Sequence, residues 1–203
     1  MEQLDFMKQM VAEEEHRKFV DSMYPRFGLK NHPGYCEIKV RPLFNPGCLV
    51  ETDDGQIKMF LNDDIEEDAF KYTTWHESSH FLHPFWRQNR QKLKDTPQRN
   101  YRLNEIVAEL GSLIFLDENY GLSSENIRKY LAGGRKSRKF NEGELTALVI
   151  AKRNKDLFGK IVNDDMNNVR RILTPYRKEA RIYLNSLCGN VSLMNFSGLG
   201  ETT

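Results

Sequence analysis

The amino-acid sequence predicts an α+β fold with a small antiparallel sheet, two helices packed on each other beside it, and a mainly helical C-terminal half. Two observations carry this prediction. Alternating, strand-like segments are confined to residues 35–61, and apolar residues at helical spacing lie on both sides of that region. We expect a single domain over residues 1–203. Its parts are an N-terminal helical segment, the sheet with the two central helices, a helical C-terminal subdomain and a tail (residues 1–30, 35–122, 123–188 and 189–203).

The composition is typical of a folded, reduced protein. Of the 203 residues, 39% are hydrophobic, which is enough to fill a core, and the net charge is +1. So small a charge gives no overall field that would attract nucleic acid or a membrane. No apolar run approaches the ~20 residues that cross a bilayer, and the acidic N-terminus is unlike a secretory signal. Cys36, Cys48 and Cys188 predict no disulfide framework, so we expect a cytoplasmic protein.

Residues 2–23 predict a helix at the start of the chain. Their apolar residues follow an approximately helical spacing, with charged residues between them. His16 stands in the charged run Glu13–Arg17, a pattern that is typical of a solvated helix face. We therefore do not expect His16 to be a metal ligand.

Three strands are predicted next. Tyr35–Val40 alternates between apolar and polar residues, Cys48–Glu51 is extended, and Gln56–Leu61 follows a second turn as the third strand. Turn residues at Asn45–Gly47 and at Asp53–Gly55 separate them. We expect an antiparallel sheet in which the last strand lies at an edge, beside the site considered next.

Residues 64–82 predict the first central helix, with its start at Asp64 or after Glu66. Pro84 ends or kinks it, because proline disfavours helical geometry at the residue before it. His76 and His80 are four residues apart and project from one helix face, where two imidazoles can bind one metal ion. Glu77 follows the first histidine and can reach a water on that ion. His-Glu-x-x-His arises by chance in under roughly one in a hundred chains of this length, so the motif needs a third ligand to support it.

The second central helix, predicted over residues 103–116, offers that ligand. Glu105 and Glu109 lie on one face of it, beside an apolar stripe that would pack on the first central helix. Glu105 as ligand, with Glu109 accepting the N–H of a ligand histidine, is a self-consistent arrangement. Which of the two glutamates binds the metal stays open from the spacing alone.

Two further histidines are weaker candidates for the third ligand. His83 shares a helix face with His80, but it lies a further turn from His76 and directly precedes a proline. His32 stands in a loop rich in glycine and proline, upstream of the predicted strands.

The C-terminal half predicts three helical segments, over residues 123–131, 141–154 and 164–187. Asn141 and Glu144 have the spacing of a capping box at the start of the second segment. Pro175 is expected to interrupt or restart the third segment.

The stretch around His76 and His80 resembles the zincin metallopeptidase motif. Paired with the downstream Asn-Glu-x-x-Ala-Glu, it looks like the gluzincins. More narrowly, it resembles the metallopeptidase domain of ArdC-type antirestriction proteins and, more distantly, the ImmA/IrrE regulatory peptidases. The resemblance covers about residues 70–122 and implies a zincin-like fold. It implies the following site: His76, His80 and Glu105 as zinc ligands, Glu77 as catalytic base, and Glu109 as an outer acceptor.

The function expected from these residues is that of a zinc metallopeptidase, an enzyme that hydrolyses peptide or protein substrates with Zn²⁺ as cofactor. Glu77 would take a proton from the attacking water and pass it to the leaving amine. Any of five tyrosines can supply an oxyanion donor: Tyr101, Tyr120, Tyr130, Tyr176 and Tyr183. Substrate-binding residues and the oligomeric state are not specified by the sequence.

Two other interpretations compete with the peptidase function. One is a zinc-containing domain that binds nucleic acid or a protein partner with little or no peptidase activity, which the locally basic residues 84–102 and 135–139 support. The other is a helical scaffold in which His76 and His80 are ordinary, partly buried side chains.

Overall fold

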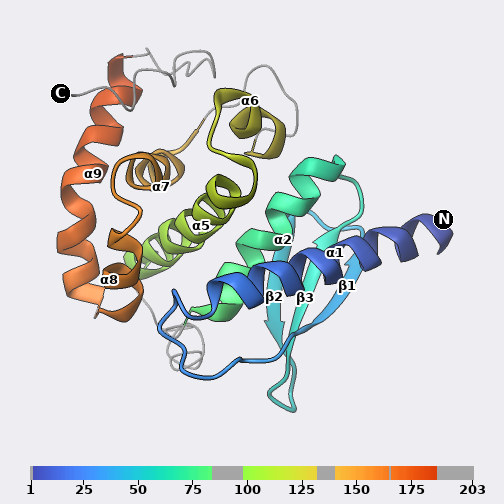
Figure 1. Ribbon diagram of the computed structural model, residues 1–203. Coiled ribbons are helices and arrows are strands. Elements are labelled where there is room, and N and C mark those ends of the chain that lie inside the picture. The colour runs from blue at the N-terminus through green and yellow to red at the C-terminus, as the bar shows by residue number, and fades with distance from the viewer. Residues whose placement is uncertain (1, 84–97, 132–139, 165, 187–203) are drawn as a thin grey trace.

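The computed structural model describes residues 2–83, 98–131, 140–164 and 166–186 (Figure 1). It confirms the α+β class, with helices predominating over a three-stranded sheet. In chain order, the described elements are α1 (Glu2–Met23), β1 (Glu37–Arg41), β2 (Gly47–Glu51), β3 (Ile57–Asn62), α2 (Glu67–Leu82), α5 (Gln98–Tyr120), α6 (Ser124–Asn126), the π-helix η1 (Ile127–Leu131), α7 (Glu142–Arg153), α8 (Leu157–Asn163) and α9 (Met166–Ser186).

The sheet is mixed, with strand order β1–β3–β2. β3 pairs in parallel with β1 and antiparallel with β2. Two predictions are therefore wrong, because the sheet is not wholly antiparallel and its last strand is central rather than at an edge. The central position buries the inward side chains of β3, since Met59 is flanked by Ile38 of β1 and Leu49 of β2.

The connection from β1 to β2 passes over the end of β3 instead of forming a hairpin. Asn62 fixes this crossover, because its amide donates to the carbonyl of Leu43 at 2.9 Å and accepts from the Leu43 N–H at 3.4 Å. The turn residues predicted at Asn45–Gly47 therefore end a crossover, and Gly47 begins β2.

Helix α2 is the central element of the molecule. It packs against α1, against strands β2 and β3, and against α5. Trp75 and Leu82 of α2 are fully buried in the resulting core. α7 packs on α5, and α9 packs on α7, which builds the helical C-terminal half (Figure 1). Within the described residues, no helix is both long and apolar enough to cross a membrane.

The two central helices occur where the sequence predicts them. α2 begins at Glu67, which matches the later of the two expected starts, and ends at Leu82 as expected. α5 begins at Gln98, five residues before the expected start, and extends to Tyr120. Gly121 follows with a positive φ of 80°, a conformation that glycine adopts without steric cost.

The C-terminal half contains one confirmed prediction and one wrong one. The capping box is confirmed, because Asn141 and Glu144 each accept the other's backbone N–H, at 3.0 and 2.9 Å. Pro175 does not interrupt α9, against expectation. It is exposed, as is Arg171, so the carbonyl that proline leaves unpaired can bind water. α8 is a helix that the sequence does not predict.

Several predictions fall outside the described residues. They concern residues 84–97 of the first basic segment, the basic loop 135–139, and the tail 189–203 with the neighbouring Cys188.

Candidate metal centre

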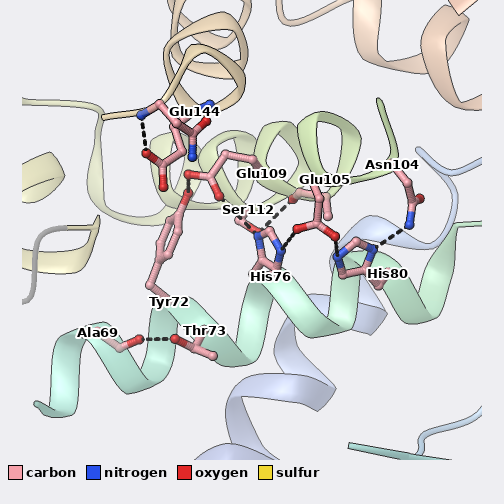
Figure 2. A network of polar contacts seen from close by, with 12 residues as sticks. Ala69, Tyr72, Thr73, His76, His80, Asn104, Glu105, Glu109, Ser112 and Glu144 are labelled. Carbon is pink, nitrogen blue, oxygen red and sulfur yellow. Dashed lines mark hydrogen bonds and ion pairs between the residues drawn. The ribbon is translucent and has the colours of Figure 1, made fainter. Parts of the chain in front are cut away.

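The centre lies where α2 crosses α5, and small residues let the two helices approach closely there. A Cβ atom on Gly111 of α5 would lie only 2.3 Å from Oγ of Ser79 on α2. A side chain at this position would force the Ser79 hydroxyl to move, so glycine favours the close crossing. The close approach brings the α5 face that carries Glu105 and Glu109 against the α2 face that carries His76 and His80 (Figure 2).

Glu105 faces both histidines of the motif. Its Oε2 lies 3.3 Å from Nε2 of His76, and its Oε1 lies 3.4 Å from Nε2 of His80. One ligand atom from each of these three residues falls within 4.8 Å of the others. Within the described part of the chain, this is the group of histidine, cysteine and acidic side chains that has the geometry to hold a metal ion.

The spacing of these atoms fits a bound cation better than a direct ion pair. A charge-assisted N–H···O contact measures ~2.7–2.9 Å. Neighbouring ligand atoms around a tetrahedral zinc ion with bonds of ~2.1 Å lie ~3.4 Å apart. The two observed imidazole-to-carboxylate distances, 3.3 and 3.4 Å, match the second value. The residues present therefore fit a divalent metal.

Each histidine has a partner on its other ring nitrogen. Nδ1 of His76 lies 3.2 Å from Oε2 of Glu109, which in turn accepts a hydrogen bond from the Tyr72 hydroxyl on Oε1 at 2.8 Å. Nδ1 of His80 lies 3.1 Å from the amide of Asn104. The Glu109 contact fixes the proton of His76 on Nδ1 and leaves Nε2 for a metal. At His80 the same tautomer requires the Asn104 amide to turn its oxygen to Nδ1, which would also give the buried Oδ1 a partner.

The sequence predicted Glu109 as a partner of a ligand histidine, and its carboxylate does lie against His76. It did not identify the other two partners, Tyr72 and Asn104. Tyr72 stands four residues before His76, so helical spacing puts it on the same face of α2. Asn104 directly precedes Glu105. Position in the chain could therefore have suggested both, but only the helix crossing shows which atoms they meet.

Glu77 is buried beneath the start of β2. Its side chain is 8% exposed, and a Cβ atom on Gly47 would lie 3.0 Å from its Cγ. Burial raises the pKa of the Glu77 carboxyl, although the nearby His80 and His76 act in the opposite direction. A carboxyl with a raised pKa is a stronger base, which suits a group that must take up a proton.

The charges of the centre depend on one another. Burial opposes the charged form of His76, yet hydrogen bonds to Glu105 and Glu109 outweigh it and raise the imidazole pKa well above its ordinary value. Burial likewise opposes the charge on Glu105, but the two facing histidines hold its pKa well below the ordinary range. The two carboxylates therefore stabilise a positive charge in the centre, either on the imidazole of His76 or on a bound cation.

The competing ligand candidates lie outside this group. His83 caps the end of α2 and is buried, and its pKa is lowered to about 4 by burial and by His80, with a hydrogen bond to Asn104 acting in the opposite direction. His32 lies near the surface, with Nε2 2.9 Å from Oδ1 of Asp21. Neither belongs to the cluster of ligand atoms.

His16 is not on a solvated face, so that prediction is wrong. Only 1% of it is exposed, and its Nδ1 lies 2.8 Å from Oγ of Ser78 on α2. Its Nε2 accepts the backbone N–H of Cys36 at 3.2 Å. His16 thus ties α1 to α2 and to the start of β1, on the side of α2 away from the metal centre.

Three of the five tyrosines proposed as oxyanion donors have described side chains, and their contacts are with residues outside the metal centre. Tyr120 and Tyr130 pack their rings against Trp75 at 5.8 and 5.3 Å, and Tyr176 accepts a hydrogen bond from Asn154 at 3.5 Å. The side chains of Tyr101 and Tyr183 fall outside the described set.

Comparisons of the chain with protein-family models, with curated proteins and with solved structures give no match. The geometry of the site therefore carries the functional inference.

Proposed function

We propose that the chain is a zinc-dependent metallopeptidase of zincin-like architecture, with Glu77 as its catalytic base. The observation that carries the proposal is the convergence of His76, His80 and Glu105 within 4.8 Å, beside the buried Glu77. The Asn104 and Glu109 contacts with the two histidines support the resemblance to gluzincins, and to ArdC-like and ImmA/IrrE-like domains among them.

The donor set favours zinc over other common divalent ions. Two imidazole nitrogens and one carboxylate oxygen are ligands that zinc prefers, whereas calcium and magnesium prefer oxygen ligands alone. Three protein ligands leave one position open, as in catalytic zinc sites. When bound there, zinc would act as a Lewis acid on the peptide carbonyl and lower the pKa of a water to ~7.

Glu77 supplies the proton transfers of the proposed reaction. It takes a proton from the attacking water, and its raised pKa stabilises the protonated form until the leaving amine accepts that proton. His80 and His76 lie close enough to act on the pKa of its carboxyl, so the proton acceptor is near the imidazoles.

Strand β2 is suited to align an extended peptide. In the described structure it pairs with β3 alone, so its other edge has backbone groups that an added strand can bind. Gly47 at its start packs against Glu77, so the start of β2 lies beside the proposed catalytic base. β3, which was expected at the edge beside the site, is central and has no free edge for this role.

Substitution of Glu77 tests the proposal. Glu77→Gln removes the proton acceptor and leaves all three metal ligands, so cleavage of a denatured protein substrate should fall by about 10²- to 10⁴-fold. New peptide termini are detected by mass spectrometry, and zinc content is measured by atomic absorption. The zinc content of Glu77→Gln is expected to equal that of the wild type.

Glu67→Gln is the matched control, because Glu67 lies on the same helix but is exposed and paired with Lys71 at 2.7 Å. It should keep both zinc and activity. Zinc-loaded wild-type protein that cleaves no substrate, or Glu77→Gln that cleaves at the wild-type rate, contradicts the proposal. Zinc binding without cleavage, together with salt-dependent binding of single-stranded nucleic acid that Glu77→Gln leaves intact, favours the binding-domain alternative.

A further inference from the structure

Tyr72 has a hydroxyl placed at the centre's outer rim. It lies on α2, four residues before His76 and therefore on the same helix face. Its side chain is buried, and its hydroxyl donates a hydrogen bond to Oε1 of Glu109 at 2.8 Å (Figure 2). The other oxygen of the same carboxylate, Oε2, lies 3.2 Å from Nδ1 of His76. The three side chains thus form a chain that ends at a proposed metal ligand.

The ring of Tyr72 has little freedom to move. It packs edge to face against Trp75, with the ring centres 6.0 Å apart. Trp75 is itself held by a hydrogen bond from its Nε1 to Glu15 at 2.9 Å. The hydroxyl is therefore presented to Glu109 from a fixed position, and it holds one of the two oxygens of that carboxylate.

The orientation of Glu109 decides which nitrogen of His76 can bind a metal. A neutral imidazole carries its proton on one nitrogen and a lone pair on the other. A carboxylate that accepts from Nδ1–H keeps the proton there and leaves Nε2 free, on the side that faces Glu105 at 3.3 Å. If Glu109 rotates away, both the tautomer and the ring angle of His76 become less defined.

We propose that Tyr72 is a positioning residue of the metal centre, whose hydroxyl holds Glu109 in the orientation that keeps Nε2 of His76 available to the ion. The inference rests on the metal centre of the proposed function and adds to it a residue that touches neither the metal nor the substrate. Phenylalanine fills nearly the same volume, so the contribution of the hydroxyl can be separated from that of the ring.

The test is the zinc affinity of Tyr72→Phe, measured by competition with a chromophoric chelator. Loss of one buried hydrogen bond that orients a ligand's partner should weaken zinc binding by about 5- to 20-fold. The d–d absorption spectrum of the Co²⁺-substituted protein should shift as well, because it reports ligand geometry directly. Tyr130→Phe is the matched control, since Tyr130 is a buried tyrosine that also packs on Trp75 but lies outside the polar cluster of the centre. Its zinc affinity and Co²⁺ spectrum should be those of the wild type.

A second variant distinguishes positioning from a general structural effect. If Tyr72 acts through Glu109, then adding Tyr72→Phe to Glu109→Ala should weaken zinc binding no further. An equal loss in both backgrounds, or unchanged affinity and spectrum in Tyr72→Phe, overturns the inference. Wild-type protein that binds no zinc overturns both the inference and the proposed function. Wild-type protein that binds zinc but cleaves nothing overturns the peptidase alone, because the Tyr72 readout is metal affinity.

Discussion

The two sides of α2 both bury polar side chains, but they do so differently. On the side facing α1, His16 meets a neutral hydroxyl on Ser78 at 2.8 Å, and Glu15 accepts the Trp75 N–H at 2.9 Å. On the side facing α5, the imidazoles of the motif meet carboxylates at 3.2–3.4 Å. The contacts with α1 have ordinary hydrogen-bond lengths, whereas those with α5 are longer than charge-assisted bonds.

The difference is one of charge. Burial lowers the pKa of His16 to about 4, so the ring is neutral at pH 7 and its neutral partners satisfy it. On the other side, Glu105 and Glu109 both face His76, and Glu77 adds a third carboxyl. Uncompensated charge is costly to bury, and a bound cation would compensate it. The contacts on the α1 side are satisfied by protein groups, whereas under the proposed function an ion would complete the α5 side.

Removing one glutamate from each side, the half-buried Glu105 or the buried Glu15, should give the largest difference between the two sides. Glu105→Ala removes a metal ligand, so zinc affinity should fall by more than about 100-fold. Glu15→Ala leaves the Trp75 N–H without its acceptor, which should cost about 1–3 kcal/mol of unfolding free energy and leave zinc affinity unchanged. Chelator competition and urea denaturation measure the two quantities. Zinc affinity that falls equally in both variants would show that the two sides do not differ in kind.

Widening the helix crossing should give a smaller effect. Gly111→Ala places a methyl group against Ser79 Oγ, which should destabilise the fold by about 1–3 kcal/mol and weaken zinc binding by separating α2 from α5. Adding Ser79→Ala removes the clashing oxygen and should restore part of both. Gly159→Ala is the control, because nothing lies within 4 Å of its added Cβ. It should be neutral or stabilise α8 by up to about 1 kcal/mol, as expected for glycine in a helix. Full stability in Gly111→Ala would contradict the close crossing.

The pH dependence of stability should report the smallest difference, on the α1 side. The folded pKa of His16, about 4, lies below its unfolded value of 6.5. The contribution of the neutral His16 to the unfolding free energy is therefore present above pH 6.5. It is lost as the pH falls towards 4, because the unfolded state binds the proton first. From pH 7 to 5.5 the loss should be about 1 kcal/mol. The unfolding free energy of His16→Gln, measured by urea denaturation in chelator, should fall by about 1 kcal/mol less than that of the wild type over this pH range. Identical pH dependences would contradict a neutral, buried His16.

Helical spacing accounts for the parts of the site that the sequence predicted. It places His76, Glu77 and His80 without any knowledge of the fold, and the apolar stripe beside Glu105 predicts that this carboxylate turns towards them. Spacing could also have corrected the prediction for His16, which falls in helical register with the buried Ala12 and Phe19 on α1.

The remainder depends on contacts between distant segments. Turn residues before Gly47 indicate that the chain reverses, but not that β3 enters between the first two strands. The choice between Glu105 and Glu109 depends on how α5 is rotated against α2, which the Gly111 crossing sets. The partners Tyr72 and Asn104 depend on the same rotation.

The zinc content of purified protein tests the central claim most directly. We expect one zinc ion per wild-type chain and none in His80→Ala. Glu109→Ala should hold less than one zinc ion per chain but a measurable amount, because the Glu109 carboxylate orients His76 without binding the metal. A wild-type chain that holds no zinc, or a His80→Ala variant that keeps a full equivalent, would contradict the account.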